Sequence, residues 1–146
     1  MYHLATILTI LFTFVARLGV FAQTEMTLSY DTTYDNADLS LSQFACSNGA
    51  NGLETKGYTT LRSLPTFPNV GGVYAIGGWN SSSCGTCYAV TYNGVTVNIL
   101  GVDRSTTGFT VSKEAMDTLT GGNAVEFGRI DVSFVDVAGS ACGLKN

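Results

Sequence analysis

Four cysteines, Cys46, Cys84, Cys87 and Cys142, have side chains able to form covalent or metal bonds in this chain of 146 residues. Cys84 and Cys87 have the Cys-x-x-Cys spacing of redox centres and of zinc sites. A zinc site needs four ligands, but the other two cysteines are scattered, and residues 88–92 look like a strand where a redox site of this kind would begin a helix. An even number of cysteines behind an export signal is typical of two structural disulfides, for which the sequence alone allows three pairings.

The N-terminal segment has the pattern of a signal peptide. Residues 4–22 are apolar apart from Arg17, and the small residue Ala22 stands where a signal peptidase would cut. The alternative is a membrane anchor, but Arg17 leaves the apolar run short of the roughly 20 residues that a span requires. We therefore predict a signal peptide at residues 1–22 and one secreted domain at residues 23–146.

Loss of the signal peptide removes the only histidine, His3. This excludes Ser-His-Asp triads, Cys-His dyads and histidine-ligated metals from the mature chain, and we predict no cofactor. The net charge of -4 and the pI of about 4.6 argue against partners such as nucleic acid or an anionic membrane surface. Only 12% of the residues are charged, and a mean hydropathy of +0.23 favours a surface-active protein as an alternative function.

Asp103 is the acidic residue best placed to act on a ligand, because it follows a predicted strand at residues 95–102. Hydrolysis of a glycosidic bond usually requires two carboxyl groups, and no convincing partner is evident. The other acidic residues considered lie in the N-terminal loop or on the outside of a predicted helix: Asp31, Asp35, Glu114 and Asp117. Asp103 therefore has three interpretations: a turn or capping residue, an acceptor for sugar hydroxyls, or the acid of a weak glycoside hydrolase.

Sugar binding without catalysis fits the residues that follow Asp103. Residues 103–110 combine a carboxylate, hydroxyls and an aromatic ring, which suit the hydroxyls and the C–H faces of a sugar. Other aromatic residues could also stack on a sugar, but most are expected in the core: Tyr30, Tyr34, Tyr58, Tyr74 and Trp79. Trp79 in particular is expected to pack, because it lies near Cys84 between glycine-rich turns.

Hydrophobic periodicity predicts a small β-rich domain with one clear helix, most simply a closed or nearly closed barrel. Asn93-Gly94 supplies the two positive φ angles of a tight hairpin turn. Ser112 is a helix cap, and Gly121-Gly122 ends the helix. Strands are expected at residues 26–30, 71–79, 88–92, 95–102 and 129–137.

These features together resemble the cerato-platanin family of small secreted fungal proteins. The matching motifs run in order along the mature chain: SYDT at 29–32, CSNGANGL at 46–53, FPNVGG at 67–72, GWNS at 78–81, CGTC at 84–87, LTGGNAV at 119–125 and ACGL at 141–144. The resemblance implies a six-stranded double-ψ β-barrel with one or two short helices, similar to the first domain of expansins. It also implies two disulfides, Cys46–Cys84 and Cys87–Cys142.

The resemblance further implies a non-catalytic secreted protein, in some cases associated with the cell wall. Its expected partners are chitin-type N-acetylglucosamine oligomers or other wall polysaccharide, including cellulose, and a plant receptor that perceives it as a defence elicitor. Expansin-like loosening of wall networks is implied, and self-association at interfaces is the alternative. The carbohydrate-binding residues carried over are Asp103, Gly108 and Thr110.

Three positions depart from the family pattern. Arg104 stands where the family often has histidine, and Thr110 stands where it often has asparagine, so one hydroxyl replaces an amide with a donor and an acceptor arm. Family members often have proline at position 82, whereas this chain has Ser82 and therefore the sequon Asn80-Ser81-Ser82. N-glycosylation of Asn80 is thus an expectation particular to this chain.

Overall fold

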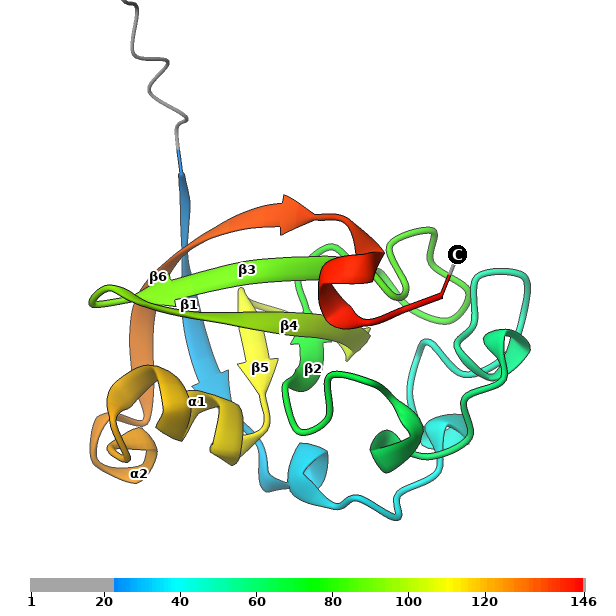
Figure 1. The fold of residues 1–146 in the computed structure, drawn as a ribbon, viewed down its shortest axis with the longest axis horizontal. Helices are drawn as coiled ribbons and strands as arrows, with labels where there is room; N and C mark the ends of the chain where they lie inside the picture. Colours follow the sequence, from blue (N-terminus) through cyan, green and yellow to red (C-terminus); the bar gives the residue numbers. More distant parts are fainter. Residues whose placement is uncertain (1–22, 146) are drawn as a thin grey trace, which may run out of the picture.

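The computed structural model describes residues 23–145, so the predicted signal peptide lies outside the described residues. Six strands close into a barrel in the order β1-β5-β2-β4-β3-β6 (Figure 1). Their bounds are β1 Thr24–Tyr30, β2 Val70–Val73, β3 Cys87–Tyr92, β4 Val95–Arg104, β5 Phe109–Val111 and β6 Arg129–Val137. The predicted six-stranded double-ψ barrel is confirmed. Among the described residues, no helix has the length and apolar character needed to cross a membrane.

The order of the strands brings distant parts of the chain to one side of the barrel. Four neighbouring pairs are antiparallel, whereas β1 pairs with β5 and β2 pairs with β4 in parallel. On β2, Gly72 lies opposite Asp103 of β4 on one side and opposite Thr110 of β5 on the other. The short strand β2 therefore sets the spacing between two of the predicted sugar-binding residues.

Local sequence signals account for the hairpin and the helix. Asn93 and Gly94 have φ angles of 45° and 82°, which confirms the predicted turn between β3 and β4. Helix α1 (Lys113–Thr120) begins after Ser112, whose hydroxyl accepts the Ala115 N–H at 3.0 Å. It ends at Gly121, with φ 65°, and the single turn of α2 (Ala124–Phe127) follows.

Two strand predictions need correction. The strand expected at residues 71–79 ends at Val73, because the chain turns at Tyr74 and continues as a loop through Trp79. Strand β5 was not predicted, because its three residues are too few to show an alternating pattern. Instead it is specified by its neighbours β1 and β2.

Aromatic rings fill the centre of the barrel. Tyr88, Phe109 and Phe134 are buried and contact one another, with ring centroids 5.0 to 6.0 Å apart. Tyr74 covers this group from the loop after β2 and is 40% exposed. Burial of each large apolar side chain contributes about 1.5–3 kcal/mol, so this cluster is a principal source of barrel stability.

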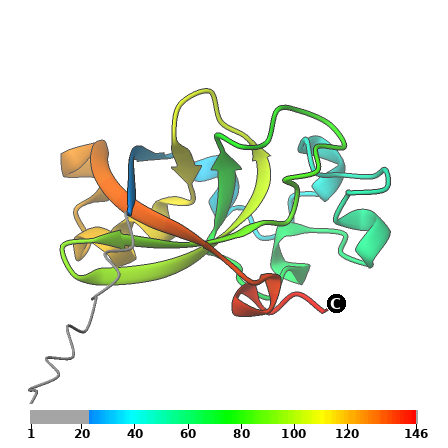
Figure 2. The ribbon, with the colours of Figure 1, turned by 90° about the horizontal axis from the view of Figure 1, so that it is seen from above.

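A second, loop-rich half lies beside the barrel, as Figure 2 shows from above. It has its own buried leucines, Leu41, Leu53 and Leu61, which join the common core. Its regular elements are four short 3₁₀ helices: η1 Thr32–Asp35, η2 Leu41–Gln43, η3 Glu54–Lys56 and η4 Leu61–Ser63.

Two disulfides hold the fold together, and both have the pairing that the resemblance implied. Cys46–Cys84 joins the loop-rich half to the segment after β2. Cys87–Cys142 joins the start of β3 to the 3₁₀ helix η5 (Gly139–Cys142). No cysteine of the described chain is free, which confirms the structural interpretation of the Cys-x-x-Cys segment.

Candidate functional site

Asp103 lies near the end of β4 and connects the two halves of the molecule. Its Oδ1 accepts the backbone N–H of Ala45 at 3.0 Å, and its Oδ2 accepts the hydroxyl of Tyr34 at 3.1 Å. Tyr34 is buried and stacks on Phe44, with ring centroids 5.6 Å apart. Asp103 is itself only half-buried, and each of its oxygens has a second lone pair that a ligand could use.

Two of the acidic residues considered in the sequence are engaged at helix α1. Asp35 accepts the backbone N–H groups of Lys113 at 2.8 Å and Glu114 at 3.0 Å, so it caps the helix from 78 residues away. Asp117 accepts one hydrogen bond from the Lys113 ammonium and another from the Ala124 backbone N–H. These two hydrogen bonds lower the pKa of Asp117. Both carboxylates therefore have structural roles at the helix.

Tyr34 and Tyr88 predict a loss of stability in alkali. Burial and the charge of Asp136 raise the pKa of Tyr88 to about 12, and burial and the Asp103 carboxylate raise the pKa of Tyr34 well above the ordinary tyrosine value. A raised pKa favours the protonated folded state, so this contribution is complete below about pH 10 and is lost as the pH rises through the folded pKa. We expect the free energy of unfolding in urea to fall from about pH 10 upward. The same slope in a Tyr34→Phe, Tyr88→Phe double variant would contradict this explanation.

Thr110 lies in β5, and Gly108 directly precedes this strand. The hydroxyls of Thr110 and Ser105 share a hydrogen bond of 3.0 Å, and Ser105 also donates to the Thr107 carbonyl at 3.1 Å. Gly108 has a φ of +59°, and a Cβ at this position would lie 2.0 Å from the Thr27 carbonyl oxygen. The strand order thus places Asp103 and Thr110 on the two strands that flank β2, both opposite Gly72. Gly108 permits close contact between β1 and the turn before β5.

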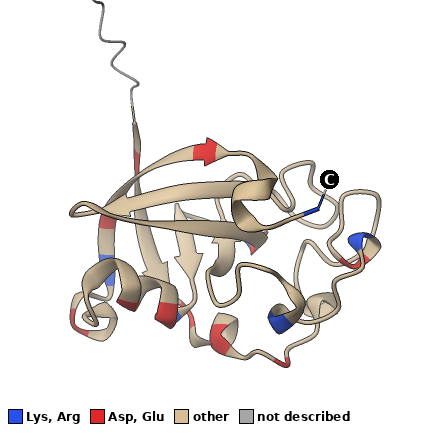
Figure 3. Ribbon diagram, viewed as in Figure 1, with Lys and Arg blue, Asp and Glu red and all other residues tan. Residues whose placement is uncertain are grey.

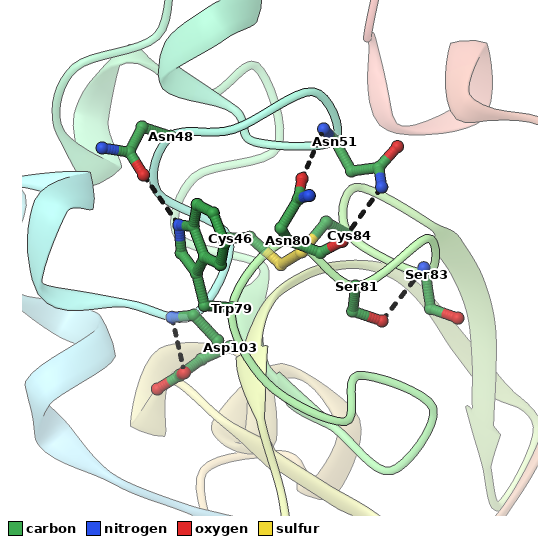
Figure 4. Close-up of a disulfide and its surroundings, with 10 residues drawn as sticks. Cys46, Asn48, Asn51, Trp79, Asn80, Ser81, Ser83, Cys84 and Asp103 are labelled. Atoms are coloured by element: carbon green, nitrogen blue, oxygen red, sulfur yellow. Dashed lines mark hydrogen bonds between the residues drawn. A yellow bond between two sulfur atoms is a disulfide. The ribbon is translucent and has the colours of Figure 1, made fainter.

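The expectation that Trp79 packs in the core is wrong. Its side chain is 64% exposed, and the indole Nε1 donates to Asn48 Oδ1 at 2.7 Å (Figure 4). The physical reason is that the chain leaves β2 at Val73, so Trp79 lies in a surface loop. The core prediction fits Tyr34, which is buried, and fits in part Tyr30 and Tyr58, which are half-buried against the core.

Asn80 locks the Trp79 loop to the loop that begins at Cys46. Its Oδ1 accepts the backbone N–H of Asn51 at 3.0 Å, and the Asn51 side chain donates back to the Asn80 carbonyl at 3.0 Å. The Cys46–Cys84 disulfide joins the same two loops. Sequence reasoning missed this constellation, although the asparagines of CSNGANGL and GWNS were a signal of polar contacts.

Asn80 also carries the prediction of N-glycosylation. We expect the intact mass of the protein recovered from a secreting host to exceed that of its polypeptide by the mass of a glycan, because the sequon follows a predicted signal peptide. A Ser82→Ala variant, in which Asn80 keeps its contacts, should have the polypeptide mass. Equal masses for wild type and variant would contradict the prediction.

Charge and cavities describe the remaining surface. Figure 3 shows the basic residues scattered over the described chain, and two of them, Lys56 and Lys145, line one cavity of about 390 Å³. Residues 23–145 contain no group of three acidic, histidine or cysteine side chains that could hold a metal ion. A shallow cavity of about 660 Å³ lies beside α2. It is lined by Tyr92, Glu126, Phe127, Arg129, Ile130 and Asp131. None of the predicted sugar-binding residues lines it.

Comparisons with known proteins give a consistent picture. The sequence model of the cerato-platanin family matches residues 26–144. The chain is 51% identical over 118 residues to the heat-stable 19 kDa antigen of Coccidioides immitis, a match that covers 81% of each chain. It is similar to the crystal structure of cerato-platanin 3 from M. perniciosa, with 50% identity, a TM-score of 0.79, and coverage of 82% of this chain and 98% of that one. It is also similar to the solution structure of the fungal elicitor cerato-platanin, with 48% identity, a TM-score of 0.73, and coverage of 80% and 95%.

Proposed function

The chain belongs to the cerato-platanin family, and from that premise we propose that it is a secreted, non-enzymatic protein that binds wall polysaccharide. The proposed ligand class is chitin-type N-acetylglucosamine oligomers, with cellulose as the competing polymer. Expansin-like loosening of wall networks follows if such binding separates polymer chains without cutting them. Perception by a plant receptor is proposed because one of the related solved structures is that of a fungal elicitor.

One observation carries the non-enzymatic proposal: Asp103 is held as a hydrogen-bond acceptor. A general acid must present a proton to its substrate, whereas each oxygen of Asp103 already accepts a protein hydrogen bond. Asp35, a candidate for the second carboxyl group that hydrolysis requires, is engaged by the helix α1 amides. The free lone pairs of Asp103 and the nearby Thr110 hydroxyl instead suit the hydroxyl groups of a bound sugar.

The test is a titration of the mature protein with N-acetylglucosamine oligomers, followed by backbone amide NMR shifts. We expect saturable shifts around residues 103–110, and smaller shifts with cello-oligomers of the same length. Absence of shifts at millimolar ligand would overturn the binding proposal. Reducing ends released from chitin by the wild type, but not by Asp103→Asn, would overturn the non-enzymatic part.

A second candidate function is self-assembly at interfaces, and exposed apolar side chains favour it. Val125 and Phe127 of α2 are 67% and 45% exposed, and Val135 of β6 is 40% exposed. If these side chains drive assembly, a Val125→Ser, Phe127→Ser double variant should form less foam than the wild type at equal concentration. Unchanged foaming would count against this surface.

A further inference from the structure

Trp79 is an exposed aromatic ring that the protein holds in a fixed orientation. Rotation of the indole is restricted, because its Nε1 donates a hydrogen bond of 2.7 Å to Asn48. A Cβ added at Gly49 would lie 3.2 Å from the ring and 2.7 Å from Asn80 Oδ1, so glycine at this position makes room for both side chains. The ring is therefore oriented before any ligand arrives, which reduces the entropy cost of binding.

The side-chain amide of Asn48, beside the indole, keeps a free hydrogen-bonding arm. Asn48 uses its oxygen for the indole, and Figure 4 shows its nitrogen pointing away from the ring. This free nitrogen is a donor, which suits a hydroxyl or acetamido oxygen at the edge of a ring stacked on Trp79.

The indole also lies close to the region of Asp103. Asp103 accepts the backbone N–H of Ala45, and Trp79 donates to Asn48, only three residues further along the same loop. Three residues of chain span at most about 11 Å, so one extended oligosaccharide can contact both places.

We propose that Trp79 is the stacking platform of a sugar subsite adjoining Asp103, with Asn48 as the residue that positions it. The ligand class is a β-linked pyranose oligomer, whose sugar rings present flat C–H faces to an aromatic surface. This inference rests on the proposed polysaccharide-binding function and adds a specific contact to it. The stacking contact itself accepts glucose and N-acetylglucosamine alike, so any preference between the two sugars comes from the Asn48 amide.

The experiment uses the fact that Trp79 is the only tryptophan of the chain. Its fluorescence and its quenching by acrylamide are followed while chitohexaose or cellohexaose is added to the secreted protein. A Ser82→Ala sample is titrated in parallel, so that a glycan on Asn80 cannot cover the ring. We expect a blue shift and protection from quenching with the same midpoint as the NMR shifts around Asp103.

Variants separate stacking from other effects, with binding measured by calorimetry. Trp79→Ala should weaken binding about tenfold or more, and Trp79→Phe, which keeps a ring, should recover part of the affinity. Asn48→Ala should weaken binding less and should leave the free indole more mobile in time-resolved anisotropy. Phe127→Ala is the matched control, because Phe127 is an aromatic residue that is 45% exposed on α2, and it should bind normally.

The outcomes distinguish this inference from the function on which it rests. If oligomers shift the amides of residues 103–110 but Trp79 stays accessible to acrylamide and Trp79→Ala binds normally, the platform is wrong and the proposed function stands. If neither the amides nor the fluorescence respond, both are overturned. A Trp79→Ala protein with a native amide spectrum and weakened binding supports the platform.

Discussion

A Gly108→Ala variant is expected to lose about 2–5 kcal/mol of its free energy of unfolding. Gly108 has a φ of +59°, which costs an L-residue about 1–2 kcal/mol. The added Cβ would also lie 2.0 Å from the Thr27 carbonyl oxygen, which belongs to the rigid strand β1. Relief of that clash would require β1 and β5 to separate at their parallel pairing. Urea unfolding followed by circular dichroism measures the loss.

Gly121→Ala is the matched control for this prediction. Gly121, which ends α1, has a φ of +65° and a ψ of 36° in the left-handed region, but a Cβ there meets nothing within 4 Å. It should lose only the conformational cost of about 1–2 kcal/mol. Equal losses in the two variants would show that the clash with Thr27 contributes nothing.

Gly108, one of the predicted sugar-binding residues, has a structural role instead. The family resemblance implied that Gly108 contacts sugar, whereas the geometry shows a steric requirement for glycine that exists without any ligand. Loss of binding in Gly108→Ala would therefore report loss of the fold. Asp103 and Thr110 are the positions where substitution tests sugar contact more directly.

Local elements could be predicted because their signals lie within a few residues. Asn93-Gly94 fixes its hairpin, and Ser112 with Gly121 bounds α1, through short-range backbone geometry and capping. The three residues of β5 have no comparable signal, and the parallel pairings of the barrel depend on contacts between distant segments. The cysteine count predicted two disulfides, but the resemblance to a family, not periodicity, predicted the number of strands and the pairing of the cysteines.

The candidate site could be predicted only in part, for a related reason. Asp103 was identified as a lone carboxylate, but its partners Tyr34 and Ala45 lie 69 and 58 residues away and follow from no local pattern. The position of Trp79 near Cys84, between glycine-rich turns, pointed to packing, but those turns carry it into a surface loop where it is 64% exposed. Its contact with Asn48 spans 31 residues. Contacts between residues far apart in the sequence therefore determine the surroundings of both Asp103 and Trp79.

Replacement of Cys46 and Cys84 by alanine is expected to reduce both stability and sugar binding. The disulfide closes a loop with a sequence separation of 38, so its removal should cost about 4 kcal/mol in the chain-entropy model. It also joins the loop of Asn48 to the loop of Trp79, so the indole of the folded variant should be more mobile. Urea unfolding and time-resolved anisotropy of Trp79 measure the two effects separately.

The matched control is replacement of Cys87 and Cys142, whose sequence separation is 55. By the same model this also costs about 4 kcal/mol, so the two variants should be about equally destabilised. Cys87–Cys142 joins β3 to η5 and does not link the loop of Asn48 to the loop of Trp79. Under conditions where both variants are folded, only the Cys46/Cys84 variant should show a mobile indole and weaker binding of chitohexaose. Equal effects on Trp79 would mean that global stability orients the platform, and unchanged anisotropy in both would mean that the asparagine contacts suffice without either disulfide.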